Sequence, residues 1–123
     1  MGKISLKKVN LPNGEEMAFR IGGEGPETIL LVHGNLVSSR HWGTLLDRLA
    51  ESYRVVAIDL RGAGESSYNE NIETFKDWAH DIKLFCDELE IRDFNLLGWS
   101  MGGGISQQFD IMSPVFKCFN VLI

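Results

Sequence analysis

The chain has 123 residues, of which 44% are hydrophobic and 24% are charged, and its formal net charge is −5. This composition is typical of a soluble globular protein, and we expect residues 1–123 to form one domain. The acidic balance, without lysine or arginine clusters interleaved with aromatic residues, argues against a phosphate-backbone partner. We therefore expect no nucleic-acid binding.

The N-terminal residues Met1–Lys8 carry charge throughout and lack the apolar core of a signal peptide. No apolar run approaches the length that spans a membrane, so we expect no membrane association and a cytoplasmic location. Cys86 and Cys118 could in principle pair, but in that compartment we expect two free thiols. Neither cysteine stands in a metal-ligand spacing.

The chain opens with a pattern typical of a β-hairpin. Lys3–Asn10 and Glu15–Ile21 each predict a strand, and Pro12-Asn13-Gly14 between them is a strong turn signal. A glycine-rich segment, residues 22–26, then breaks the pattern. The next segment, Thr28–Val32, is continuously apolar, which favours a strand buried on both faces.

Apolar side chains recur at helical spacing in two later segments. The first predicts one helix that begins after Ser38 or Ser39 as its N-cap. Its apolar positions are Trp42, Leu45, Leu46 and Leu49. The second predicts a long helix whose apolar residues we assign to the core rather than to a cofactor site. Its apolar face consists of Phe75, Trp78, Ala79, Ile82, Phe85, Cys86 and Leu89.

Further buried strands are predicted at Arg54–Asp59 and Phe94–Leu97. A helix follows from about Met101 to Met112, and the last apolar segment ends at Val121–Ile123. Strands that alternate with helices indicate parallel βαβ units with right-handed crossovers. The sequence therefore predicts an α/β fold, a three-layer sandwich with a mostly parallel sheet and an antiparallel N-terminal hairpin.

The most informative segment is Gly98-Trp99-Ser100-Met101-Gly102, between the strand at Phe94–Leu97 and the next helix. A sharp strand-to-helix turn presses together the residues two before and two after the serine, which favours glycine at both places. Ser100 would then have a strained backbone, with its hydroxyl raised above the sheet near the first amides of the helix. This arrangement is a nucleophile elbow.

The strand at Thr28–Val32 also ends in a suggestive loop, His33-Gly34-Asn35-Leu36. In an open α/β sheet, ligands bind beyond the carboxyl ends of strands, where successive connections leave in opposite directions. If the two strands are neighbours, this loop and the elbow frame one crevice. That crevice could hold a reacting carbonyl group.

Three motifs in this chain resemble those of the α/β-hydrolase family. Residues 31–35 (Leu-Val-His-Gly-Asn) resemble the oxyanion loop after the family's third strand. Residues 59–66 (Asp-Leu-Arg-Gly-Ala-Gly-Glu-Ser) resemble the loop after the fourth strand, and residues 97–103 (Leu-Gly-Trp-Ser-Met-Gly-Gly) resemble the elbow after the fifth. The resemblance covers nearly the whole chain and implies an α/β-hydrolase fold that ends at the sixth strand.

The resemblance implies a serine hydrolase that acts on small carboxylic esters or related acyl compounds. Ser100 would be the nucleophile, and the backbone N–H groups of Met101 and Asn35 would donate to the oxyanion, with Leu36 a less favoured second donor. Trp99 and Leu36 are possible apolar walls of the substrate pocket. Epoxide and dehalogenation chemistry are disfavoured, because relatives that perform them have an aspartate in place of Ser100. No cofactor is implied.

The three histidines are not expected to be catalytic. His33 precedes the glycine of the oxyanion loop, where the family uses a histidine to brace the loop, and His41 is interpreted as a surface or packing residue. His80 with Asp77 and Asp81 could suggest a metal cluster, but a solvated helix face is the favoured interpretation.

The loop after the fourth strand carries the charged residues Asp59 and Arg61 and several glycines. Asp59 and Arg61 are expected to determine loop geometry. Residues 62–64 (Gly-Ala-Gly) lack the third glycine of a dinucleotide fingerprint, and the chain has no phosphate loop.

In this family an acid and then a histidine follow the serine along the chain. Residues 101–123 contain no histidine, and Asp110 is their sole carboxylate. We therefore expect a truncated product or fragment of a longer hydrolase, weak or inactive by itself, with an incomplete sheet edge that invites self-association. Two alternatives stay open: a non-catalytic binding or assembly module, and complementation by a partner chain that supplies the acid and base.

Overall fold

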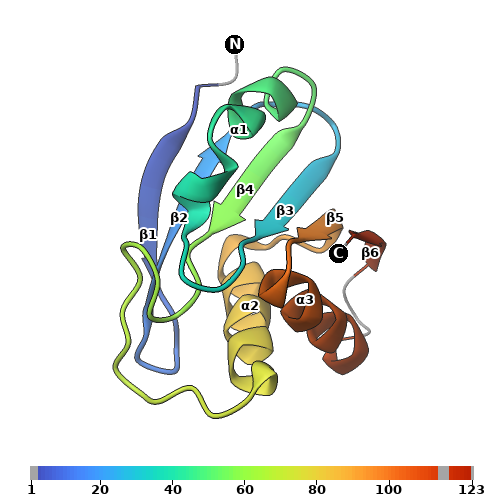
Figure 1. Ribbon diagram of the computed structural model, residues 1–123. Coiled ribbons are helices and arrows are strands. Elements are labelled where there is room, and N and C mark those ends of the chain that lie inside the picture. Colours follow the sequence, from blue (N-terminus) through green and yellow to red (C-terminus); the bar gives the residue numbers. More distant parts are fainter. Residues whose placement is uncertain (1–2, 114–116, 123) are drawn as a thin grey trace.

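The computed structural model describes residues 3–113 and 117–122 (Figure 1). The chain forms an open six-stranded sheet in the order β1-β2-β4-β3-β5-β6. The strands are β1 (Ser5–Asn10), β2 (Glu16–Gly22), β3 (Thr28–Val32), β4 (Arg54–Ile58), β5 (Asp93–Gly98) and β6 (Lys117–Leu122). The helices are the 3-10 helix η1 (Ser39–Trp42), α1 (Thr44–Leu49), α2 (Phe75–Leu89) and α3 (Met101–Met112).

The predicted N-terminal hairpin is confirmed. β1 and β2 pair antiparallel, with Asn10 opposite Glu16 and Ser5 opposite Ile21. In the turn, the Leu11 N–H donates to the Glu15 carbonyl (2.8 Å), and the Gly14 N–H donates to the Leu11 carbonyl (3.1 Å). β2 also pairs antiparallel with β4, so the hairpin extends the sheet on one side.

The rest of the sheet is parallel, as the alternation of strands and helices predicted. β3 lies between β4 and β5 and pairs parallel with both. The chain leaves β3 toward β4 on one side and leaves β5 toward β6 on the other, so these connections depart in opposite directions. The loops after β3 and β5 therefore meet at the topological switch point of the sheet.

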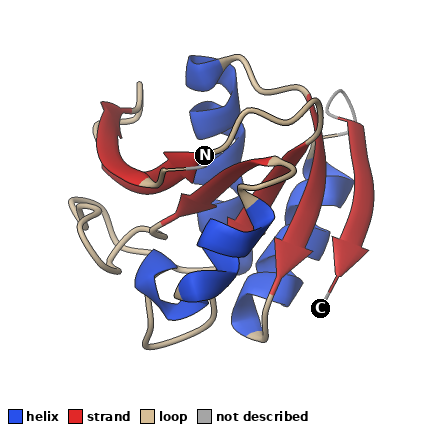
Figure 2. Ribbon diagram, turned by 90° about the horizontal axis from the view of Figure 1, so that it is seen from above, coloured by secondary structure: helices blue, strands red, loops and turns tan. Residues whose placement is uncertain are grey.

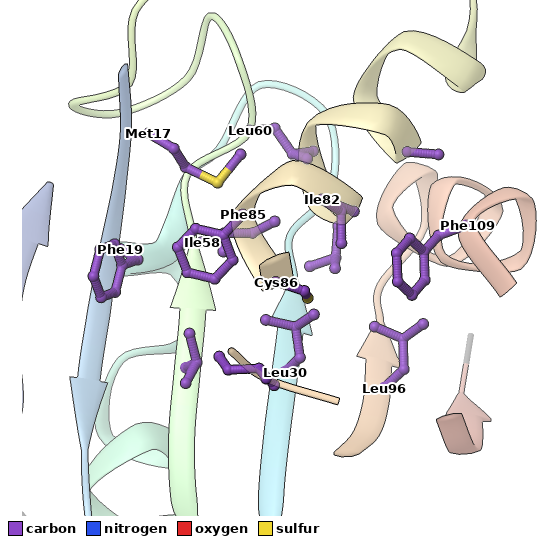
Figure 3. Close-up of a cluster of buried hydrophobic side chains, with 14 of the residues drawn as sticks. Met17, Phe19, Leu30, Ile58, Leu60, Ile82, Phe85, Cys86, Leu96 and Phe109 are labelled. Carbon is purple, nitrogen blue, oxygen red and sulfur yellow. The ribbon is translucent and has the colours of Figure 1, made fainter. Parts of the chain in front are cut away.

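Helices cover both faces of the sheet, which gives three layers (Figures 1 and 2). α2 and α3 lie side by side on one face, where Leu30 and Val32 of β3 join a large apolar core. Figure 3 shows Phe85 of α2 and Phe109 of α3 within this core. The intervening Leu31 points to the other face and packs in a smaller cluster under α1. Continuous apolarity along β3 follows from this burial on both sides.

The single helix expected after Ser38 or Ser39 is instead two short pieces. Ser38 caps η1, which ends at Trp42, and α1 begins only at Thr44. Gly43 between them has φ 53° and ψ −132°, a backbone conformation that suits glycine and interrupts the helix. Of the expected apolar positions only Leu46 is fully buried, and Leu45 is 39% exposed.

Two other details differ from the sequence-based expectation. The strand expected to end at Asp59 ends at Ile58. Phe75, assigned to the core, is 41% exposed at the first turn of α2. Cys86 is buried in the core, and the side chain of Cys118 lies outside the described residues, so the expectation of two free thiols stays a prediction. Within residues 3–113 and 117–122, no helix is long and apolar enough to cross a membrane.

Candidate active site

The turn between β5 and α3 has the sharp geometry predicted for residues 98–102. Ser100 has φ 58° and ψ −120°, a conformation rarely adopted by a residue with a side chain. A Cβ atom at Gly98 would clash with the Gly102 carbonyl and lie 2.6 Å from the Ser106 Oγ. The serine is exposed at the N-cap of α3, and its hydroxyl makes no capping hydrogen bond.

The same turn is packed against the end of β3. A Cβ atom at Gly102 would clash with the carbonyl groups of Val32 and His33, so only glycine allows α3 to approach so closely. The Trp99 N–H donates to the Val32 carbonyl (3.1 Å). These contacts bring the two sheet-end loops together, as the sequence predicted for neighbouring strands.

A cavity of about 470 Å³ opens where the loops meet, and Asn35, Leu36 and Met101 are among the residues that line it. Ser100 directly precedes Met101 in the chain and therefore lies next to this cavity. In the part of the chain that the structure describes, no hydrogen bond engages the backbone N–H of Asn35 or of Met101. Asn35 and Met101, whose amides were predicted as oxyanion donors, therefore line the same cavity.

His33 is buried (1% exposed) and connects the loop after β3 to the loop after β4. Its Nε2 accepts a hydrogen bond from the Leu60 N–H (3.0 Å), so Nδ1 carries the proton and donates to the Gly34 carbonyl (2.7 Å). Burial lowers the pKa of His33 below its ordinary value and favours the neutral ring. Both ring nitrogens are occupied, so His33 braces the loop and has no free acceptor for a serine proton.

Asp59 organises the neighbouring loops, as expected. Its carboxylate is 1% exposed and accepts from the backbone N–H groups of Ser39 (2.7 Å) and Glu65 (2.9 Å). Gly64, with φ 53°, lies so close to this carboxylate that a Cβ atom would clash with it. Asp59 therefore joins the start of η1 to the loop after β4.

Arg61 belongs to a buried ionic network that was not predicted from the sequence. Its guanidinium donates to both oxygens of Asp81 (2.7 and 2.8 Å) and lies 3.9 Å from the Glu15 carboxylate. The hydrogen bond to Asp81, more than the opposing effect of burial, raises the pKa of Arg61. This pairing also joins the wall of the cavity to the hairpin, because Asn13 donates to Asp81 as well (2.9 Å).

The solvated helix face expected for Asp77, His80 and Asp81 is therefore wrong for Asp81, which is fully buried. The sequence held a signal: Asp81 lies three residues after Trp78 and four before Phe85, within the apolar stripe of α2. Asp77 instead completes the capping box of α2 with Thr74. The described residues contain no cluster of three or more side chains that could hold a metal ion.

The two proposed pocket walls lie in different surroundings. Leu36 lines the cavity, although it is 94% exposed and has φ 65°. Trp99 is absent from the cavity lining and stacks on His41, with ring centroids 4.6 Å apart and 22° between the planes. His41 is thus an exposed packing residue, as expected.

Comparison with known proteins places this chain in one family. Residues 27–109 match the model of the alpha/beta hydrolase fold, and the chain belongs to that family. The match includes all three motifs recognised in the sequence.

The chain is 36% identical over 102 residues to the dihydrolipoyllysine-residue acetyltransferase component of the acetoin cleaving system of Cupriavidus necator, and covers 27% of that protein. It is 36% identical over 101 residues to the 2-hydroxy-6-oxononadienedioate/2-hydroxy-6-oxononatrienedioate hydrolase of Escherichia coli K12, and covers 35% of it. These alignments use 83% and 78% of this chain.

Among solved structures, the chain superposes on that of a membrane phospholipase A, a bacterial virulence factor, with a TM-score of 0.85 and 31% identity. The superposition covers 93% of this chain and 37% of the phospholipase. The chain thus spans roughly a third of the length of the proteins it matches.

Proposed function

We propose that Ser100 is the nucleophile of a serine hydrolase that acts on carboxylic esters or related acyl compounds through an acyl-enzyme. One observation carries this proposal. Ser100 has a strained backbone at a strand-to-helix turn, beside a cavity lined by two residues, Asn35 and Met101, whose amides are free. Backbone strain of this kind persists where the surroundings enforce it, and it clusters at active sites.

The chemistry that this geometry supports is acyl transfer to a hydroxyl. The Ser100 Oγ attacks the acyl carbon and gives up its proton to a base, while the carbonyl oxygen takes the negative charge. The N–H groups of Asn35 and Met101 donate to that oxygen. Collapse of the intermediate expels the alcohol, which takes a proton, and water then releases the acid. Each preorganised donor of this kind is worth about 10²–10³ in turnover.

The base and its acid partner are not supplied by residues 1–123 in this proposal. Both nitrogens of His33 are engaged, and residues 101–123 contain no histidine. The carboxylate of Asp110 is exposed near the far end of α3. Among the described residues, no hydrogen bond joins His41 to Ser100. Because a serine hydroxyl without a base is a poor nucleophile, we expect the 123-residue chain to be weak or inactive by itself.

The relatives support an acyl-transfer or hydrolytic activity. These relatives are named as a hydrolase, a phospholipase and an acetyltransferase. Since the chain covers about a third of each, the ester class is our proposal for this chain.

A fluorophosphonate probe tests the role of Ser100 directly, with imidazole added to supply the missing base. We expect slow labelling that imidazole accelerates, and mass spectrometry should map the adduct to Ser100. Ser100→Ala should abolish it, whereas Ser106→Ala, which changes a buried serine of α3, should retain it. No adduct at Ser100, with or without imidazole, would refute the proposal.

Both ring nitrogens of His33 are engaged, so it supplies Ser100 with no base, and this favours a second candidate, a binding or assembly module that keeps the cavity without turnover. In that case the chain binds an ester but does not hydrolyse it. Hydrolysis of a simple aryl ester, lost in Ser100→Ala, would contradict this candidate. A size measurement tests complementation, because a clean monomer has no second chain to donate the acid and base.

A further inference from the structure

Trp99 lies between the two loops that carry the candidate oxyanion amides. It directly precedes Ser100 and Met101, and its indole packs against Gly34, which directly precedes Asn35. A Cβ atom at Gly34 would lie 2.6 Å from Cε3 and 2.8 Å from Cζ3 of this indole. The ring therefore occupies the space that any other residue at position 34 would need.

The indole is held by a second contact. The His41 ring stacks on it at a centroid distance of 4.6 Å. His41 in turn lies on η1, where its N–H donates to the Ser38 carbonyl (2.9 Å) and the Ser39 N–H donates to Asp59 (2.7 Å). The backbone of Trp99 is also anchored, since its N–H donates to Val32 and its carbonyl accepts from Gly102.

The tip of the proposed oxyanion loop, Asn35 and Leu36, is exposed. Leu36 at its tip is 94% exposed and in a left-handed conformation, so its side chain contributes almost no packing. On the buried side of this loop, the Nδ1–H of His33 donates a hydrogen bond to the Gly34 carbonyl. The side-chain atoms nearest to a Cβ at Gly34, among the described residues, belong to the indole of Trp99.

We infer that Trp99 is a positioning residue: its indole, held by His41, sets the separation between the Asn35 and Met101 amides. This inference rests on the proposed function for its effect on catalysis, but its effect on the loop can be measured independently. Trp99 does not line the cavity of about 470 Å³, so the inferred effect runs through the two amides.

Four variants separate this role from a general effect on folding. Trp99→Ala removes the contact, Trp99→Phe retains a flat ring, and His41→Ala removes the stacking partner. Arg40→Ala is the matched control, because Arg40 is an exposed neighbour of His41 on η1. Trp99 is 45% exposed, so its replacement removes little core.

Two measurements are made on each variant. In ¹⁵N relaxation, we expect order parameters of about 0.85 at Asn35 and Met101 in the unmodified chain, and a fall below about 0.6 at Asn35 in Trp99→Ala. In fluorophosphonate labelling with imidazole, we expect Trp99→Ala to react about a hundredfold more slowly, the cost of a displaced catalytic group. Trp99→Phe should restore most of both values, His41→Ala should lower both partly, and Arg40→Ala should change neither.

The inference is overturned if Trp99→Ala leaves the Asn35 order parameter and the labelling rate unchanged, or if Asn35 is already mobile in the unmodified chain. If Trp99→Ala does not fold, His41→Ala decides: an unchanged Asn35 overturns the inference, and a mobile Asn35 supports it. If the unmodified chain is never labelled, the proposed function fails, while the relaxation data still decide the role of Trp99.

Discussion

Replacing Arg61 by methionine should destabilise the chain far more than breaking an exposed ion pair. Asp81 is fully buried and accepts from Arg61 and Asn13. In Arg61→Met its carboxylate keeps only the Asn13 donor. Glu15 loses its nearest cation but keeps hydrogen bonds from Ser67 and from the backbone of residues 69 and 70. The uncompensated charge of Asp81 is therefore the main cost.

The expected magnitude follows from that burial. Removing one partner of a buried ion pair costs about 3–5 kcal/mol of the free energy of unfolding. With a urea dependence of about 2 kcal/mol per M, the unfolding midpoint should fall by about 2 M. The double variant Arg61→Met with Asp81→Leu removes both charges, so it should recover much of the loss.

Urea unfolding followed by tryptophan fluorescence measures these differences. Lys83→Met on α2 is the matched control, because Lys83 pairs with Asp87 at 2.8 Å, but the two side chains are 40% and 36% exposed. Such exposed pairs contribute about 0–1 kcal/mol. If Arg61→Met costs no more than Lys83→Met, the assignment of a buried network is wrong.

Three further predictions concern the glycines of α3 and the buried ionisable groups. Gly102→Ala places a methyl group against backbone carbonyls and should lower the free energy of unfolding by about 1–3 kcal/mol or more. In Gly104→Ala the methyl group meets only the movable ring of Phe75, so the free energy of unfolding should stay within about 1 kcal/mol of that of the unmodified chain. Thermal unfolding compares the two variants. Burial lowers the pKa of His33 below its ordinary value of 6.5, so at pH values below 6.5 the unfolded chain binds more protons than the folded chain. The free energy of unfolding should therefore fall as the pH drops below 6.5, and it should fall less in His33→Gln. Burial alone would raise the pKa of Glu15, but hydrogen bonds from Ser67 and the loop lower it on balance. Its stabilising effect should be full above its ordinary value of 4.5 and lost as pH falls below it, so urea titrations of Glu15→Gln and the unmodified chain should converge in acid.

The elbow could be predicted from sequence because its requirements are local. The close approach of Gly98 to Gly102 and the strained φ of Ser100 involve five consecutive residues, so the pattern itself encodes the geometry. The parallel sheet followed from the continuous apolarity of β3 and β4 between helical segments.

The division of the first helix could not be predicted from apolar spacing. Trp42 and Leu46 keep helical spacing across Gly43, and only the backbone conformation of Gly43 separates η1 from α1. A single glycine is compatible with either outcome, and tertiary packing decides.

The buried network was missed because its partners are distant in sequence. Asp81 interrupts an apolar stripe, which signals a buried charge, but its partner Arg61 lies 20 residues away in a glycine-rich loop. The stacking of His41 on Trp99 likewise joins separate loops. Periodicity describes one element at a time and carries no information about such pairs.

A crystal structure of the chain phosphonylated at Ser100 would test most directly whether the serine and the two amides form one site. The phosphonyl oxygen should lie about 2.7–3.1 Å from the backbone nitrogens of both Asn35 and Met101, with Ser100 at positive φ. An oxygen that points to solvent, far from Asn35, would contradict the oxyanion site and with it the proposed hydrolase mechanism.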